Sequence, residues 1–105
     1  MKKIKAEKRV KALGWKDGTV AEFLELTSEE SALIEIKLAL SRKLRERRQR
    51  RMTQAQLARK LQSSQSRIAK AETGDSSVSI ELLVRAMLAT GATPKQIGKT
   101  IADNT

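Results

Sequence analysis

Three polar residues, Gln65, Ser66 and Lys70, fall close together in one short segment of helical composition. In a helix, these positions lie away from the apolar Ile68 and Ala71, so their side chains share the outward face. An α-helix fits the major groove of B-DNA, where glutamine, serine and lysine can hydrogen-bond to base edges or phosphates. The chemistry that this face offers is polar recognition rather than bond making.

The chain lacks the two residue types that most often serve in catalysis and metal binding. The chain of 105 residues contains no cysteine and no histidine. Disulfides, the usual zinc sites and the usual pairs of nucleophile and base are therefore unavailable. The 12 acidic residues are scattered and form no cation-binding loop. We expect a protein that is not an enzyme and that uses no metal and no cofactor.

The charge is strongly positive and is arranged in blocks. Lysine and arginine number 22, which gives a formal net charge of +10. Residues 1–16 carry seven basic side chains, residues 17–36 carry six acidic and no basic ones, and residues 42–51 carry seven basic ones. This excess predicts a polyanionic partner, with nucleic acid ahead of an anionic membrane. An arginine run is often only a solvated face, so we expect part of residues 42–51 to contact phosphate.

The sequence gives no sign of membrane insertion or export. It has no apolar run long enough to span a bilayer, and no apolar segment follows the basic start. We therefore expect a cytoplasmic protein without a membrane partner.

The starts of several helices can be predicted because a four-residue capping pattern recurs. In this pattern a threonine hydroxyl accepts from the third helical N–H, and a Glu or Gln side chain accepts from the threonine N–H. The pattern begins at Thr19, Thr27, Thr53 and Thr93, and Ser79 is a further expected cap. Strand patterns are weak. The predicted fold is all-α, with helices over about 19–25, 28–50, 54–61, 65–73, 80–90 and 94–102.

The longest predicted helix carries two apolar stripes. One has helical spacing and suits packing on a small core. It consists of Leu33, Ile36, Leu40 and Leu44. The second, Ile34 and Leu38, is rotated by one residue and needs another partner. The N-terminal segment, a second subunit and a different protein all remain open as that partner.

The two short central helices are joined by only three residues, Gln62, Ser63 and Ser64. Helices joined by so short a link cross steeply. Ala58 is small enough to let the second helix approach closely, with Ile68 packed over it. This arrangement predicts a helix-turn-helix, although a plain helical hairpin would also account for Ala58 and Ile68.

The pattern T-Q-x-x-L-A-x-x-L-x-S-S-Q-x-x-I-x-x-x-E-x-G, from Thr53 to Gly74, resembles the Cro/C1-type helix-turn-helix domain of the XRE family. The resemblance covers about residues 38–90 and implies a small lambda-repressor-like DNA-binding domain. One departure is Gln62, where the family usually has glycine. That position ends a helix in the left-handed conformation, which costs a non-glycine residue about 1 kcal/mol. The link after the long helix is also one residue shorter than usual.

The resemblance implies roles for individual side chains. The implied base-contacting residues are Gln65, Ser66 and Lys70. The implied phosphate-contacting residues are Gln54, Ser63, Ser64, Arg67, Arg50 and Arg51. Gln54 would also brace Gln65, and Ser64 would cap the recognition helix. Glu72 would form a structural ion pair with Arg47 or Arg48, between which the sequence does not decide.

We divide the chain into an N-terminal extension, residues 1–27, and a helix-turn-helix DNA-binding domain, residues 28–105. The only aromatic residues, Trp15 and Phe23, lie in the extension. They either cover the long helix or form a docking element for a partner. The layout of the chain is similar to HigA-like antitoxins, which implies a small basic RelE/HigB-type toxin as that partner.

The resulting prediction is a sequence-specific transcriptional repressor. It would bind a palindromic operator as a homodimer, through Leu88, Ile97 and Ile101 unless these close the monomer's own core. As the antitoxin of a toxin–antitoxin module, it would regulate its own operon. Two alternatives stay open. The helix-turn-helix could be only the scaffold of a toxin-neutralising interaction module, or the chain could bind nucleic acid without sequence preference.

Overall fold

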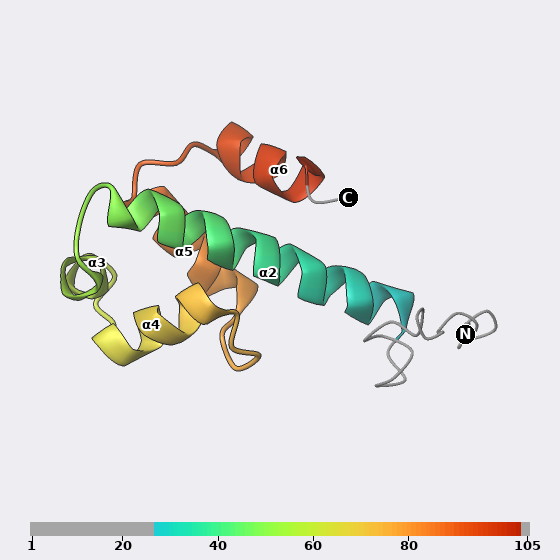
Figure 1. Cartoon of the computed structure of the whole chain (residues 1–105), viewed down its shortest axis with the longest axis horizontal. Helices are drawn as coiled ribbons and strands as arrows, with labels where there is room; N and C mark the ends of the chain where they lie inside the picture. Colours follow the sequence, from blue (N-terminus) through green and yellow to red (C-terminus); the bar gives the residue numbers. More distant parts are fainter. Residues whose placement is uncertain (1–26, 104–105) are drawn as a thin grey trace. The chain divides into compact units, whose positions relative to one another are not determined.

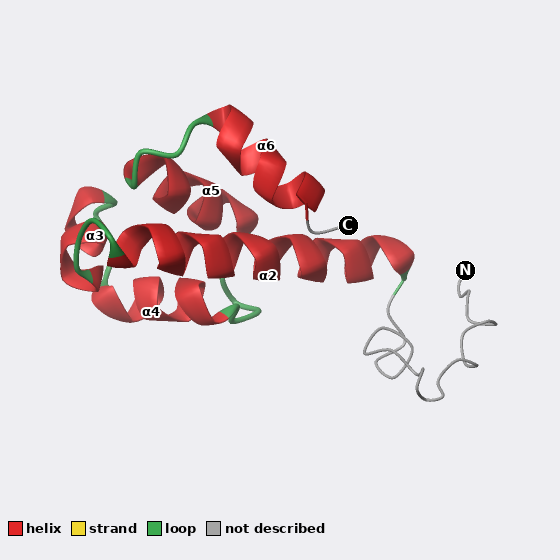
Figure 2. Cartoon of the chain, turned by 45° about the horizontal axis from the view of Figure 1, so that its top comes forward, coloured by secondary structure: helices red, strands yellow, loops and turns green. Residues whose placement is uncertain are grey.

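The computed structural model describes residues 27–103, and these form five α-helices and no strand (Figure 2). They are α2 (Ser28–Gln49), α3 (Gln54–Lys60), α4 (Gln65–Thr73), α5 (Ile80–Ala89) and α6 (Pro94–Asp103). The all-α prediction is confirmed, with helix ends within a residue or so of those expected. The helix predicted over 19–25, its cap Thr19 and both aromatic residues, Trp15 and Phe23, lie outside the described residues. The chain divides into two compact units, Met1–Glu35 and Ile36–Thr105.

Side-chain caps fix where the helices begin. At the start of α2, the Thr27 hydroxyl accepts from the Glu30 N–H at 3.1 Å, and the Glu30 carboxylate accepts from the Thr27 N–H at 2.9 Å. The same reciprocal pair forms between Thr53 and Gln56 before α3, and between Thr93 and Gln96 before α6. Three of the predicted capping boxes are thus confirmed.

One apolar core holds the second unit together. Leu40 and Leu44 of α2 are fully buried in it, together with Leu57 of α3, Ile68 of α4 and Met87 of α5. Ala58 and Ala71 are also buried in this core, and the burial of Ala58 agrees with the close approach of α4 that was expected there. The short helices are stable because they share this core, since isolated helices of 7 to 10 residues are marginal in water.

The three apolar residues proposed as a dimer contact have different environments. Ile97 is buried in the core, and Ile101 packs against it. Leu88 keeps 45% of its surface exposed. Ile97 therefore closes the monomer's own core, which was the alternative considered for it, and Leu88 remains available at the surface.

The part of α2 from residue 36 onward separates the helix-turn-helix from the C-terminal helix. In both views α4 and α6 lie on opposite sides of α2 (Figure 1, Figure 2).

The C-terminal end of α5 is held by two basic side chains. Arg47 donates from Nε to the Thr90 hydroxyl at 3.1 Å, and Lys60 donates to the Ala89 carbonyl at 3.1 Å. Lys60 thus pairs with a carbonyl group at the end of the helix, and Arg47 lies next to another, that of Thr90. Such terminal carbonyl groups lack helical N–H partners and attract positive charge.

Among the described residues, left-handed backbone occurs at Gln62, Gly74 and Gly91. Gly74 ends α4 with φ of 77°, a conformation that strains any residue with a side chain. An added Cβ there would lie 2.5 Å from Leu38 Cδ2, so the Leu38 side chain would have to shift. Gln62, in the turn between α3 and α4, has φ of 54° and is the one positive-φ non-glycine residue among those described. The left-handed conformation expected at Gln62 from the sequence is therefore present.

Replacing Gln62 with glycine should stabilise the fold by about 0.5–1 kcal/mol, because glycine adopts a positive φ without steric cost. Chemical denaturation of both proteins would measure the difference in the free energy of unfolding. Gln62→Ala is the matched control, since alanine shortens the side chain but keeps the strain. Equal stability of the glycine and alanine variants would show that the conformation of Gln62 is not strained.

Candidate nucleic-acid interface

Helix α4 presents a polar face to solvent and an apolar face to the core. Gln65, Ser66 and Arg67 in its first turn are exposed, and Lys70 is exposed one turn later. Ile68 and the other inward-facing residues anchor the helix. The three residues predicted to contact bases therefore lie on one accessible helical surface, as the sequence pattern required.

The first turn of α4 is capped by a serine side chain. The Ser64 hydroxyl accepts from the Arg67 N–H at 3.2 Å and also lies 3.2 Å from the Ser66 hydroxyl. Ser64 thus has the capping role expected from the sequence. Ser63, just before it, is half-buried, and its N–H donates to the Ala58 carbonyl at 2.8 Å, which closes the turn after α3.

A chain of polar contacts, hereafter the brace, connects α2 to the exposed end of α4. Arg48 donates to both Glu72 carboxylate oxygens, from Nε at 2.7 Å and from Nη2 at 2.8 Å. Gln54 at the start of α3 donates from Nε2 to Glu72 Oε1 at 3.1 Å. Gln65 in turn donates from Nε2 to Gln54 Oε1 at 3.4 Å. The brace therefore connects a buried carboxylate to the exposed amide of Gln65.

The buried end of the brace is charged. The Glu72 residue is only 6% exposed. Burial alone would raise the pKa of the Glu72 carboxyl, but the hydrogen bonds from Arg48 and Gln54 outweigh it and hold the pKa below its ordinary value. The hydrogen bond to Glu72 outweighs the effect of burial on Arg48 and raises the pKa of its guanidinium. Glu72 is therefore ionised in the folded protein near neutral pH.

The structure decides between the two arginines considered for the ion pair. Arg48 pairs with Glu72, whereas Arg47 faces the end of α5 and donates to the hydroxyl and carbonyl groups of Thr90. The two residues are adjacent in a helix, so their side chains point about 100° apart. Of the two alternatives left open by the sequence, Arg48 therefore forms the ion pair and Arg47 does not.

Basic side chains surround the exposed end of the brace. A shallow hollow of about 470 Å³ brings Arg50 and Arg51, at the end of α2 and just after it, beside Gln54 and Gln65. A neighbouring hollow of about 420 Å³ is lined by Arg51 together with Arg59 and Lys60 of α3. Arg59 and Lys60 were not among the phosphate-contacting residues expected from the sequence, although their positions on the polar face of α3 could have indicated them. Arg67 lines neither hollow and lies on α4 itself.

Comparison with known proteins agrees with this geometry. A family model described as helix-turn-helix matches residues 42–97, more than half of the chain. No curated protein and no solved structure matches the chain. The chain belongs to the helix-turn-helix family of the Cro/C1 type. It is a DNA-binding transcription regulator, and α3 and α4 form its helix-turn-helix.

Among the described residues, no helix is both long enough and apolar enough to cross a bilayer.

The brace predicts a specific acid dependence of stability. A carboxyl whose folded pKa is lowered stabilises the protein fully above its unfolded pKa, about 4.5, and this contribution is lost as the pH falls through the folded value. Glu72→Gln should cost about 3 kcal/mol at neutral pH, because it leaves Arg48 without its partner. It should also flatten the loss of stability on acidification.

Denaturant unfolding of the wild type and the variant, at several values from about pH 7 to about pH 3, measures both effects. Glu81→Gln, at an exposed glutamate in the first turn of α5, is the matched control and should keep the wild-type acid dependence. A Glu72→Gln variant with the same acid dependence as the wild type would contradict the assignment.

Proposed function

We propose that the protein is a sequence-specific repressor that reads DNA bases through Gln65, Ser66 and Lys70 in the major groove. The observation that carries this proposal is the brace, which holds the amide of an exposed glutamine at the start of α4. A glutamine amide can make two hydrogen bonds to adenine, and holding it in place lowers the entropic cost of that contact. Lys70 lies one turn further on and reaches either a base or a phosphate.

Phosphate contacts would orient α4 on the duplex. Six residues are assigned to them, and they come from the segment just after α2, the start of α3, the turn before α4 and α4 itself. They are Gln54, Ser63, Ser64, Arg67, Arg50 and Arg51. Arg50 and Arg51 line the hollow that also holds Gln54 and Gln65, which supports a backbone contact beside the reading helix. Arg59 and Lys60 extend the same basic surface along α3.

The proposed repressor acts as a homodimer on a palindromic operator. One copy of α4 spans only a few base pairs, and two copies about 34 Å apart would read two half-sites. The exposed Leu88 on α5 supports an apolar contact between the two copies. Ile97 does not support this contact, because its side chain is buried in the core of the monomer.

The ordering of Gln65 favours base reading over the two alternatives. A helix-turn-helix that served only as a scaffold would gain nothing from a hydrogen bond that orders an exposed side chain. A binder without sequence preference would need only the basic residues, since phosphate contacts carry affinity but no sequence information.

The sharpest test compares two substitutions in the same helical turn. An operator would first be selected from random duplexes with the wild-type protein. Gln65→Ala should weaken binding to this operator by about 1–3 kcal/mol and relax the preference at one base pair. Arg67→Ala should weaken binding to all sequences alike and reduce the slope of log K against log salt by about 0.9.

Fluorescence anisotropy against the operator, its single-base variants and an isolated half-site measures these effects. Two results would contradict the proposal. One is a Gln65→Ala variant with unchanged affinity and base preference. The other is equal affinity of the wild type for half-site and palindrome, which would remove the dimer.

We also propose that the protein is an antitoxin that regulates its own operon and binds a small basic RelE/HigB-type toxin through Trp15 and Phe23. The similarity of the sequence layout to HigA-like antitoxins supports this role. In the described part of the first unit, Glu29 and Glu30 are exposed beside the exposed apolar Leu33 and Ile34. An apolar patch with an acidic rim suits a basic protein partner.

The double substitution Trp15→Ala and Phe23→Ala should abolish binding of a toxin encoded beside this gene and leave operator affinity within a few-fold. Co-purification measures the first effect, and anisotropy the second. Circular dichroism checks that the helices persist. A folded double variant that still binds the toxin would place the docking surface elsewhere. A variant that loses its helices would assign Trp15 and Phe23 to the core.

A further inference from the structure

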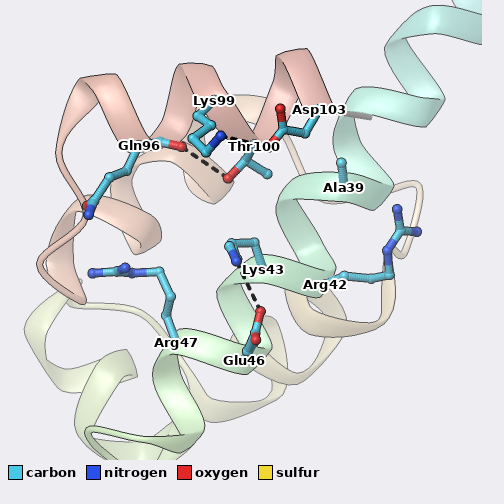
Figure 3. A pocket seen from close by; sticks show the side chains of 9 residues that line it. All are labelled: Ala39, Arg42, Lys43, Glu46, Arg47, Gln96, Lys99, Thr100 and Asp103. Atoms are coloured by element: carbon cyan, nitrogen blue, oxygen red, sulfur yellow. Dashed lines mark hydrogen bonds and ion pairs between the residues drawn. The ribbon is translucent and has the colours of Figure 1, made fainter. Parts of the chain in front are cut away.

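A hollow of about 600 Å³ lies between the second half of α2 and α6, away from the helix-turn-helix (Figure 3). Its α2 wall includes Arg42, Lys43 and Arg47, and its α6 wall includes Gln96 and Lys99. Its volume is in the range of small-molecule sites. Because α4 lies on the other side of α2, a duplex bound to α4 would not reach this hollow (Figure 1).

The walls of the hollow carry an excess of positive charge. Four of the lining side chains are basic and two are acidic, Glu46 and Asp103, so the balance is 4 − 2 = +2. Both carboxylates already have basic partners, at 3.3 Å from Lys43 and at 3.3 Å from Lys99. These pairs are about half exposed or more and contribute little, so both lysines can turn toward an anion at small cost.

Arg47 is the fixed element of this hollow. It is half-buried, and its guanidinium is held by Nε and Nη2 against the hydroxyl and carbonyl of the buried Thr90. Its partners are neutral, and none of the carboxylates described in the structure forms a salt bridge with it. The Gln96 amide and the Arg47 guanidinium turn toward each other across the hollow (Figure 3). A guanidinium held in this way is already oriented to bind an anion.

We infer that this hollow binds the phosphate group of a small molecule. Donors approach from both walls, with Arg47 and Lys43 on α2 and Lys99 and Gln96 on α6. A phosphate group is tetrahedral, so its oxygens point in different directions and can accept hydrogen bonds from both walls at once. A carboxylate group is planar, and its two oxygens point to one side. The ligand would bridge α2 and α6. This inference does not depend on the proposed operator or toxin.

The test is a titration of the full chain, labelled with ¹⁵N, with pyrophosphate at a fixed ionic strength of about 0.15 M. Pyrophosphate should shift the backbone amide signals of Gln96, Lys99 and Thr100 before those of Gln65 and Ser66. Lys99→Gln should weaken this binding about tenfold, because it removes one charge-assisted hydrogen bond. Lys95→Gln is the matched control, since Lys95 is exposed on α6, loses the same charge and does not line the hollow.

The control should stay within about twofold of the wild type, a change too small for a lost contact. Equal weakening by Lys99→Gln and Lys95→Gln would mean that pyrophosphate is attracted only by the general charge of the chain, and would overturn the inference. Shifts confined to α3 and α4 would place the anion on the DNA-binding face, and would overturn it as well. Neither outcome would alter the tests of DNA recognition.

Discussion

The buried ion pair between Glu72 and Arg48 is the interaction on which the arrangement of this domain depends. A carboxylate on a side chain that is only 2% exposed is costly to bury unless its charge and its hydrogen-bonding oxygens are matched. Arg48 matches both oxygens, and Gln54 adds a third hydrogen bond. Because these groups belong to α2, α3 and α4, their hydrogen bonds fix how α4 is rotated as well as where it packs.

The apolar core and the ion pair make different contributions to the site. Leu44, Leu57 and Ile68 bring the helices together without specifying direction, because burial of apolar surface is non-directional. Hydrogen bonds at 2.7 to 3.1 Å add direction, and the brace carries that direction to the surface. The proposed base-contacting face is therefore built outward from a buried charge, and the exposed Gln65 is the last member of the brace.

Local features of this fold were predictable from the sequence, and long-range choices were not. Capping boxes depend on residues three positions apart, so Thr27, Thr53 and Thr93 revealed the helix starts directly. The choice between Arg47 and Arg48 depends on the rotation of α2 relative to α4, across 24 residues of sequence. The hollow beside α6 was missed for the same reason, since Lys43 and Lys99 are far apart in the chain.

We propose that Gln54 holds Gln65 in position for base recognition, and a double-mutant cycle measures the coupling between these two side chains. Operator affinity would be measured for the wild type, Gln54→Ala, Gln65→Ala and the double variant. Residues in contact typically show a coupling free energy of about 0.5 kcal/mol or more, and we expect a value of this size here. If the effects of the two substitutions simply add, Gln65 acts independently of the brace, and Gln54 does not position it for base recognition.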